Sequence, residues 1–157
     1  MLLRDARDAD SDGVIDLIGE VYDEYACVLD VDGEMPYARA IATYFTRGGG
    51  RIWVAESRER AGRIIASGAF LPVDGGIELH KLYLRREERG SGLASTLCDR
   101  IEGEGRTRGA RFVELWSDTR FERAHRFYER RGYVRGATTR DLHDKSNSTE
   151  FYFRLDL

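Results

Sequence analysis

The chain has 157 residues with 25 basic and 28 acidic side chains, and its formal net charge at neutral pH is −3. This length suits one domain with a sizeable buried core, so we expect a single domain over residues 1–157. The interspersed charges form no obvious basic face, which argues against nucleic acid as a partner, and the two prolines and the lack of low-complexity tracts argue against disorder.

The first half of the chain shows helical and strand periodicity in turn. Apolar residues recur at helical spacing from Val14 to Tyr25, behind an N-cap at Asp10 or Ser11. Pro36 suits the first position of a second helix. The predicted elements are a strand at residues 1–6, a helix from Asp10 or Ser11 to Tyr25, a helix from Pro36 to the glycines at 48–50, and an antiparallel hairpin of strands at residues 51–57 and 63–71.

Between the two helices lies an acidic segment, residues 26–35. Asp30, Asp32 and Glu34 surround Gly33 in a pattern that superficially resembles a calcium loop. The remaining ligand positions and the terminal bidentate Glu are missing, so we exclude calcium binding. Two interpretations remain, a solvated loop or an acidic lip that attracts a cationic amine.

The stretch from Glu78 to Ala94 combines a strand, a charged turn and a glycine-rich turn that opens a helix. The two strand faces predicted from its alternation are Leu79, Lys81 and Tyr83 against His80, Leu82 and Leu84. Glycines let a backbone approach an anion closely, and the first N–H groups of a helix have no intrahelical partner. Because a lone G-x-G is a weak signal, a phosphate-binding helix N-terminus and a tight turn without a ligand both fit.

Helices and strands alternate in the second half of the chain. Apolar residues from Leu93 to Ile101 define one buried helix face, and Cys98 shares it, which indicates a core thiol. Thr119 and Glu122 have the spacing of a capping box that opens the next helix, which Gly132 ends. Strands are predicted at residues 111–116, 133–142 and 150–157. The resulting order implies a mixed sheet with helices on both faces.

Cysteine content and hydropathy bear on the environment of the protein. Cys27 and Cys98 are too few for a disulfide framework, and neither has a Cys or His neighbour at metal-ligand spacing, so we expect no metal. The first ten residues lack the apolar run of a signal peptide, and no window approaches the length of a membrane span. We therefore expect a cytoplasmic protein without a membrane partner.

Two motifs in the second half occur together with a strand between them. The first is LHKLYL followed by R-G-S-G-L-A at Arg89–Ala94, and the second is A-H-R-F-Y-E-R-R-G-Y-V at Ala124–Val134, with the strand FVELW between. They resemble the (Arg/Gln)-x-x-Gly-x-(Gly/Ala) acyl-CoA signature and the A-x-x-(F/L)-Y-x-x-x-G-(F/Y) segment of the GNAT superfamily of N-acetyltransferases. Either motif alone is weak to moderate, whereas the pair is specific, and the resemblance covers essentially the whole chain.

The resemblance implies an α/β (α+β) fold with a mixed, mostly antiparallel central sheet of about seven strands and about four helices. The sheet would splay between its fourth and fifth strands, at residues 79–84 and 112–116. Acetyl-CoA would be the co-substrate, with its pyrophosphate on the N–H groups from Gly90 to Ser95 and its pantetheine along the fourth strand. The cofactor-binding residues implied are Leu82, Tyr83, Leu84, Arg89, Gly90, Ser91, Gly92, Leu93, Ala94 and Ser95.

The resemblance further implies direct attack by an amine in a ternary complex, which needs two proton transfers. Tyr128 sits where the family's general-acid Tyr sits, and the alternative is an aromatic core residue. Glu78 occupies the place where some members carry a general-base Glu. It could also be a strand-end Glu without that role, in which case His80 is the alternative base. A strand N–H near Leu82 or Tyr83 would stabilise the oxyanion.

One residue departs from the family pattern, and other motifs fail on their context. Many members carry Asn where this chain has Phe121, so a cofactor contact is lost or is replaced by Arg120 or Arg123. The glycine turn lacks the third glycine of a Rossmann fingerprint, and no Walker A sequence occurs. Ser91 and Ser95 have no His neighbour that would make either a nucleophile.

The acceptor is the least determined part of the function. We expect a small cationic amine, in a pocket closed by residues 26–35 and the last hairpin. The alternatives are a non-catalytic acyl-CoA sensor and an acetyltransferase that acts on protein N-termini or lysines. The resemblance also makes a homodimer possible, since that state is common in the family.

Overall fold

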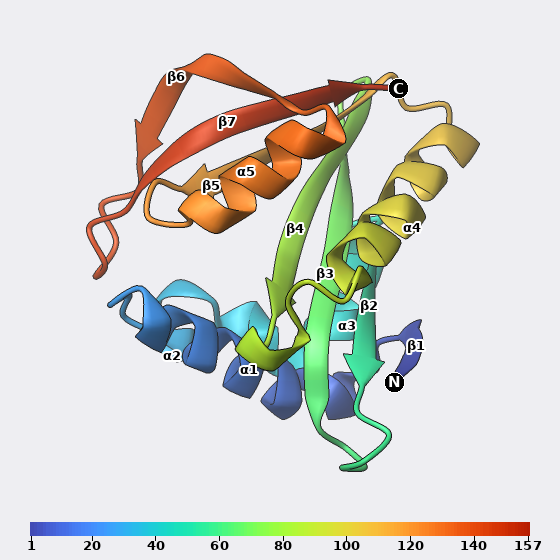
Figure 1. Cartoon of the computed structure of the whole chain (residues 1–157), viewed down its shortest axis with the longest axis vertical. Coiled ribbons are helices and arrows are strands. Elements are labelled where there is room, and N and C mark those ends of the chain that lie inside the picture. Colours follow the sequence, from blue (N-terminus) through green and yellow to red (C-terminus); the bar gives the residue numbers. More distant parts are fainter.

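A seven-stranded mixed sheet forms the centre of the computed structural model, which describes residues 1–157 (Figure 1). The spatial order of its strands is β1-β2-β3-β4-β5-β7-β6. The strands are β1 Leu2–Asp5, β2 Arg51–Glu56, β3 Ile64–Val73, β4 Gly76–Leu84, β5 Phe112–Asp118, β6 Val134–Asp141 and β7 Thr149–Asp156. The helices are α1 Ser11–Glu24, α2 Val31–Glu34, α3 Ile41–Arg47, α4 Leu93–Thr107 and α5 Glu122–Arg131.

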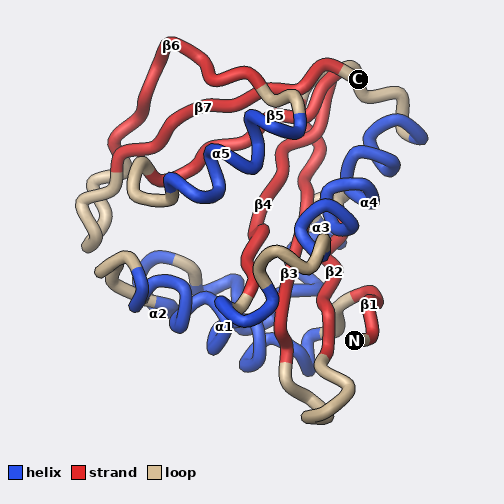
Figure 2. The backbone as a smooth tube through the Cα atoms, in the orientation of Figure 1, coloured by secondary structure: helices blue, strands red, loops and turns tan.

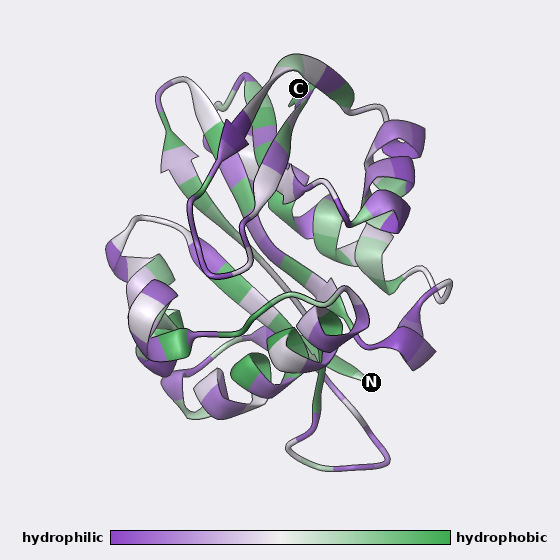
Figure 3. Ribbon diagram, turned by 90° about the vertical axis from the view of Figure 1, so that its left-hand side faces the viewer, coloured by the Kyte–Doolittle hydropathy of each residue, from purple (hydrophilic) through white to green (hydrophobic).

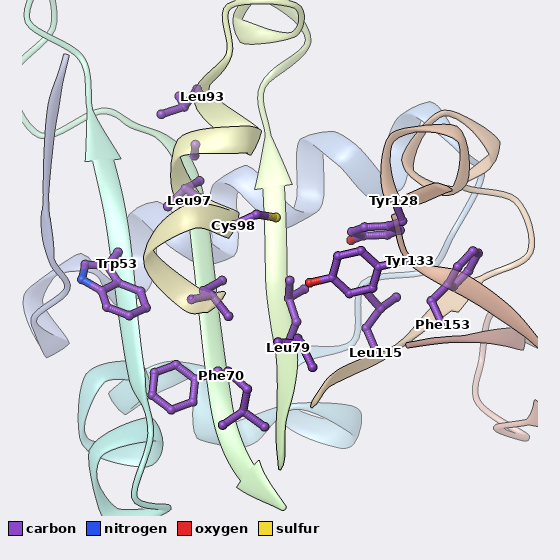
Figure 4. Close-up of a cluster of buried hydrophobic side chains, with 14 of the residues drawn as sticks. Trp53, Phe70, Leu79, Leu93, Leu97, Cys98, Leu115, Tyr128, Tyr133 and Phe153 are labelled. Atoms are coloured by element: carbon purple, nitrogen blue, oxygen red, sulfur yellow. The ribbon is translucent and has the colours of Figure 1, made fainter. Parts of the chain in front are cut away.

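Helices cover both faces of the sheet, as predicted (Figure 2). Alternate residues of β2 belong to different cores: Trp53 packs with α4, whereas Ile52 and Val54 pack with α1 and α3. Figure 4 shows part of the first core, with Leu97 and Cys98 of α4 against the strands. In Figure 3, hydrophobic residues gather where helices and strands meet. None of the helices combines the length and apolar character needed to cross a membrane.

The sheet splays between β4 and β5, which confirms the predicted position of the opening. These two strands are parallel and pair only at Ile77 with Val113 and at Glu78 with Glu114. By contrast, β5 pairs antiparallel with β7 along its whole length, from the pair of Phe112 with Asp156 to the pair of Asp118 with Glu150. Beyond Glu78 the strands diverge (Figure 1), so that segment of β4 has no strand partner on its β5 side.

A β-bulge in β4 overturns the predicted assignment of its two faces. Lys81 adopts a left-handed φ of +53°, and the pairing register with β3 shifts between Ser67 and Ala69. The Ser67 hydroxyl donates to the Lys81 carbonyl at 2.6 Å. Because the extra residue reverses the alternation, Leu82 and Leu84 pack in the same core as Leu79, and Tyr83 packs in the other.

Local backbone geometry also corrects two helix predictions. The helix expected from Pro36 is divided into a 3₁₀ turn, Pro36–Ala40, and α3, because Ala40 has non-helical φ and ψ of −136° and 61°. The Ser11 hydroxyl accepts from the Ile41 N–H at 3.1 Å and satisfies the new helix start. The acidic segment contains a one-turn helix, α2, so five α-helices replace the expected four.

The capping box predicted at Thr119 and Glu122 is wrong. Helix α5 begins at Glu122 with Phe121 as its N-cap and no side-chain cap. The Asp118 carboxylate instead accepts from the Arg120 N–H at 2.9 Å, which forms a turn at the end of β5. This turn directs the chain from the sheet into α5 without a role for Thr119.

Candidate active site

A cleft of about 1090 Å³ opens where β4 and β5 diverge. Its walls come from β4, the turn that precedes α4, the end of β5, α5, the segment after α1 and the β6–β7 loop. Every residue predicted for the site lines this cleft except Ser91. The fold thus brings together residues that are separated by as much as fifty positions, from Glu78 to Tyr128.

The glycine turn presents unpaired backbone donors to the cleft. Gly90 and Gly92 have left-handed φ values of +80° and +86°, and Gly92 is the N-cap of α4. The N–H groups of Gly90, Ser91, Gly92, Ala94 and Ser95 make no hydrogen bond within the chain. A Cβ placed on either glycine would meet no atom within 4 Å, so the space before these donors is open. This arrangement fits an anion at a helix N-terminus.

Two side chains of the turn hold the turn itself in place. The Ser91 hydroxyl donates to the Glu88 carbonyl at 2.6 Å. Arg89 lines the cleft, but its guanidinium donates to both carboxylate oxygens of Glu24 at 2.7 and 2.8 Å. Because a bidentate pair occupies the fork of donors, Arg89 ties the turn to the end of α1. The backbone, not this arginine, offers the free donors.

Glu78 and His80 lie next to each other on the face of β4 opposite α4. The His80 Nε2 and a Glu78 carboxylate oxygen are 3.5 Å apart, and both side chains line the cleft. The interaction with His80 holds the pKa of the Glu78 carboxyl below its usual value. Glu78 is therefore ionised at neutral pH, and His80 Nε2 makes no shorter contact with another polar group.

Tyr128 approaches the cleft from the other face of the sheet. Its side chain is 5% exposed and packs against Tyr133 and Phe153, with ring centroids 5.7 Å from each. In Figure 4 its hydroxyl points towards β4. Burial raises the pKa of this phenol well above its usual value, so it remains protonated at every physiological pH. Cys98, as expected, is a fully buried core residue.

A buried Ser–His pair beside the cleft, of which only the serine lines it, was not identified from the sequence. Ser117 of β5 lines the cleft, and its hydroxyl lies 3.1 Å from Nε2 of His125 on α5. Both residues are less than 10% exposed, and burial lowers the pKa of His125, which is therefore neutral. The available signal was the position of His125 one turn before Tyr128, on the same helix face. At the position of the family Asn, the Phe121 ring contacts Tyr25, with centroids 4.8 Å apart.

Contacts between the segment after α1 and the β6–β7 loop cross one side of the cleft; we name them the clasp. The Ser146 hydroxyl accepts from the Val28 N–H at 2.8 Å. The Lys145 ammonium pairs with Asp30 at 2.7 Å, and the Lys145 N–H donates to Glu34 at 2.7 Å. The acidic lip of residues 26–35 thus uses two of its carboxylates to hold the β6–β7 loop.

Comparisons with known proteins agree with this architecture. Residues 18–133 match the profile of the Acetyltransferase (GNAT) family. A GNAT-family acetyltransferase from Staphylococcus aureus Mu50 is 17% identical, with a TM-score of 0.83 over 99% of this chain and 98% of that one. A ribosomal-protein-alanine N-acetyltransferase from Brucella melitensis is 18% identical, with a TM-score of 0.74 over 100% of both chains. The PaiA N-acetyltransferase from Thermoplasma acidophilum, solved with coenzyme A, is 16% identical, with a TM-score of 0.75 over 99% of this chain and 98% of that one.

No curated protein matches the chain. The family match nevertheless covers most of the sequence and includes both motifs, the glycine turn and most of the segment around Tyr128. The solved structures independently share the fold over nearly the entire chain. The resemblance drawn from the two motifs is confirmed: the chain belongs to the acetyltransferase (GNAT) family.

Proposed function

We propose that the protein transfers an acetyl group from acetyl-CoA directly to the primary amine of a small molecule. The observation that carries this proposal is one cleft in which an open set of helix N-terminal donors, an unpaired strand edge and a buried tyrosine meet. Membership of the family and the coenzyme A complex of the PaiA protein support the choice of donor.

The turn from Gly90 to Ser95 and the edge of β4 would hold the donor. Free N–H groups before α4 suit the pyrophosphate of coenzyme A, because an anion there meets several donors and the positive end of the helix dipole. The unpaired edge of β4 at Leu82–Leu84 suits the amide-rich pantetheine arm, which could pair with it like an added strand. Acetyl-CoA supplies an activated acetyl thioester, and an N–H near Leu82 or Tyr83 would stabilise negative charge on its carbonyl oxygen.

Glu78, His80 and Tyr128 would move the protons. Glu78 is ionised and can attract an ammonium group and accept its proton, directly or through a water. His80, its neighbour at 3.5 Å, is the alternative base. Tyr128 would protonate the leaving thiolate. Its burial raises its own pKa, but the same burial makes a thiolate more basic, so a proton transfer between them remains feasible.

The clasp supports a small acceptor. Lys145 and Ser146 reach across to Asp30, Glu34 and Val28, so one side of the cleft is bounded by chain instead of opening as a shallow groove. A protein segment would need these contacts to open, whereas a small amine would not. The acidic lip was expected to attract a cationic amine, but Asp30 and Glu34 already have partners. Glu78 would attract the amine instead.

The test is release of free thiol from acetyl-CoA in the presence of an acceptor panel. The panel contains polyamines, amino acids, aminoglycosides and peptides with free N-termini. We expect turnover with one class of small amine and none with the peptides. Turnover with the peptides alone would replace the small-molecule proposal by protein acetylation, and tight coenzyme A binding without any turnover would indicate a sensor.

A further inference from the structure

We propose that the acceptor is an amino-acid-type molecule, whose carboxylate is bound by Lys81 and Arg140 while its amine faces Glu78. This inference rests on the proposed function, and it names the substrate class. It follows from two cationic side chains that line the cleft and keep free donors: Lys81, which has no partner, and Arg140, whose two terminal nitrogens are free.

Lys81 is the first of these charges. It stands at the β-bulge of β4 with a φ of +53°, a conformation that a lysine seldom adopts. The bulge re-aims its side chain, and the ammonium lies 5.3 Å from the centre of the Tyr37 ring. Lys81 is half-buried, lines the cleft, and makes no ion pair or hydrogen bond through its side chain. A partly buried lysine without a counter-ion is suited to an anionic ligand.

Arg140 of β6 is the second. Its guanidinium lies 4.3 Å from the centre of the Trp116 ring, which fixes its plane. Only its Nε is engaged, with Glu150 at 2.8 Å, and the two terminal nitrogens make no hydrogen bond. These nitrogens form the part of the fork that can bind a carboxylate with two donors.

The position of Arg140 relative to Glu78 fixes the kind of acceptor. Glu78 pairs with Glu114 of β5, and the Trp116 ring that Arg140 covers lies two residues further along the same face of that strand. Arg140 also contributes to the lowered pKa of the Glu78 carboxyl. A group that can bind an anion therefore lies near a group that can bind an ammonium, as an acceptor with a carboxylate and an amine requires. Arg140 pairs with Glu150 through Nε alone, whereas the Lys145 ammonium pairs with Asp30 and Arg120 pairs with Asp118.

Matched sets of three acceptors test the inference. Each amino acid is compared with its primary amide and with the amine that remains after removal of its carboxylate, and kcat/KM is measured for all three. We expect the wild-type protein to prefer the acids at least tenfold. Lys81→Met, which removes the charge and keeps an unbranched stem, should reduce that preference about tenfold through KM, without changing the dissociation constant of acetyl-CoA or the melting temperature.

Lys145→Met provides the control, because it removes the other lysine that lines the cleft. Lys145→Met should change kcat/KM for the acids and for the amides by the same factor. Three results would overturn the inference and leave the acetyltransferase proposal standing. The wild type could act equally on acids and amides, or Lys81→Met could lose the same factor of kcat/KM on both. The third result is a wild-type preference for aminoalkyl phosphates over amino acids. Absence of turnover with every amine would refute both.

Discussion

Tyr128 and the pair of Glu78 and His80 reach the cleft from opposite faces of the sheet, which suits a reaction with one proton transfer on each side. The resemblance predicted roles for Tyr128 and Glu78, because family members carry a general-acid Tyr at the first position and some carry a general-base Glu at the second. The Ser117–His125 pair could not be predicted, since it depends on how α5 packs against β5. The edge-to-face contact of Phe121 with Tyr25 could not be predicted for a similar reason.

Tyr128→Phe should lower kcat about 100-fold and leave acetyl-CoA affinity within about twofold, because only the proton donor is removed. Tyr133→Phe is the matched control. Its hydroxyl is also buried and has no partner, but Tyr133 does not line the cleft. Steady-state kinetics and calorimetric titration check both variants. Equal kcat values for Tyr128→Phe and the wild type would refute the acid role.

Glu78→Gln should lower kcat/KM about tenfold or more across pH 5–9, because the carboxyl is ionised throughout that range. A carboxyl with a lowered pKa also stabilises the folded state above its unfolded pKa, and this contribution is lost as the pH falls through the folded pKa. The wild type should therefore lose more unfolding free energy than Glu78→Gln between pH 5 and 3. If Glu78→Gln keeps the pH–rate profile of the wild type and His80→Gln loses most of its kcat/KM, the base is His80.

The turn before α4 and the bulge in β4 show what local sequence does and does not specify. Two glycines at fixed spacing before an apolar helix predict the turn, because only glycine adopts its φ values readily. The bulge has no such signal: Lys81 is not a residue that favours positive φ, and its carbonyl is held by Ser67 of β3. Simple alternation therefore assigned Leu82 and Leu84 to the wrong face.

Gly92→Ala should weaken acetyl-CoA binding about tenfold or more, because a Cβ would occupy the open space before the free N–H groups. Gly109→Ala is the control: Gly109 has a similar φ of +74° and equally open surroundings, but lies outside the cleft. Both variants should lose about 1–2 kcal/mol of unfolding free energy from backbone strain. Calorimetric titration and chemical denaturation separate the two effects. Equal coenzyme affinity in both variants would mean that the turn is not the phosphate site.

The whole molecule combines a splayed sheet with a clasp that bounds the opening on one side. The seven strands and the splay were predictable because the motif order specifies a known fold. Closure by residues 26–35 and the last hairpin was expected, but its chemistry was not: the acidic residues bind a loop more than a hundred positions away. Sequence spacing carries no information about such a contact.

Lys145→Ala should raise the KM of the acceptor several-fold while kcat and acetyl-CoA affinity stay close to wild type, because the clasp bounds only the acceptor side. The Lys145 side chain is 64% exposed, so the loss of its pair with Asp30 should leave global stability nearly unchanged. Arg154→Ala, which removes an exposed pair with Asp156 outside the cleft, is the control. An unchanged acceptor KM in Lys145→Ala would exclude a role for the clasp in acceptor binding.

Direct transfer within this cleft is the central claim, and a single-turnover experiment tests it. The protein is mixed with acetyl-CoA and an accepted amine, and the acetylated amine, free thiol and intact protein mass are followed together. The account predicts that acetylated amine and thiol appear at the same rate and that the protein mass never changes. An acetylated protein that forms and decays during the turnover, for example on Ser117, or thiol release without acetylated amine, would contradict it.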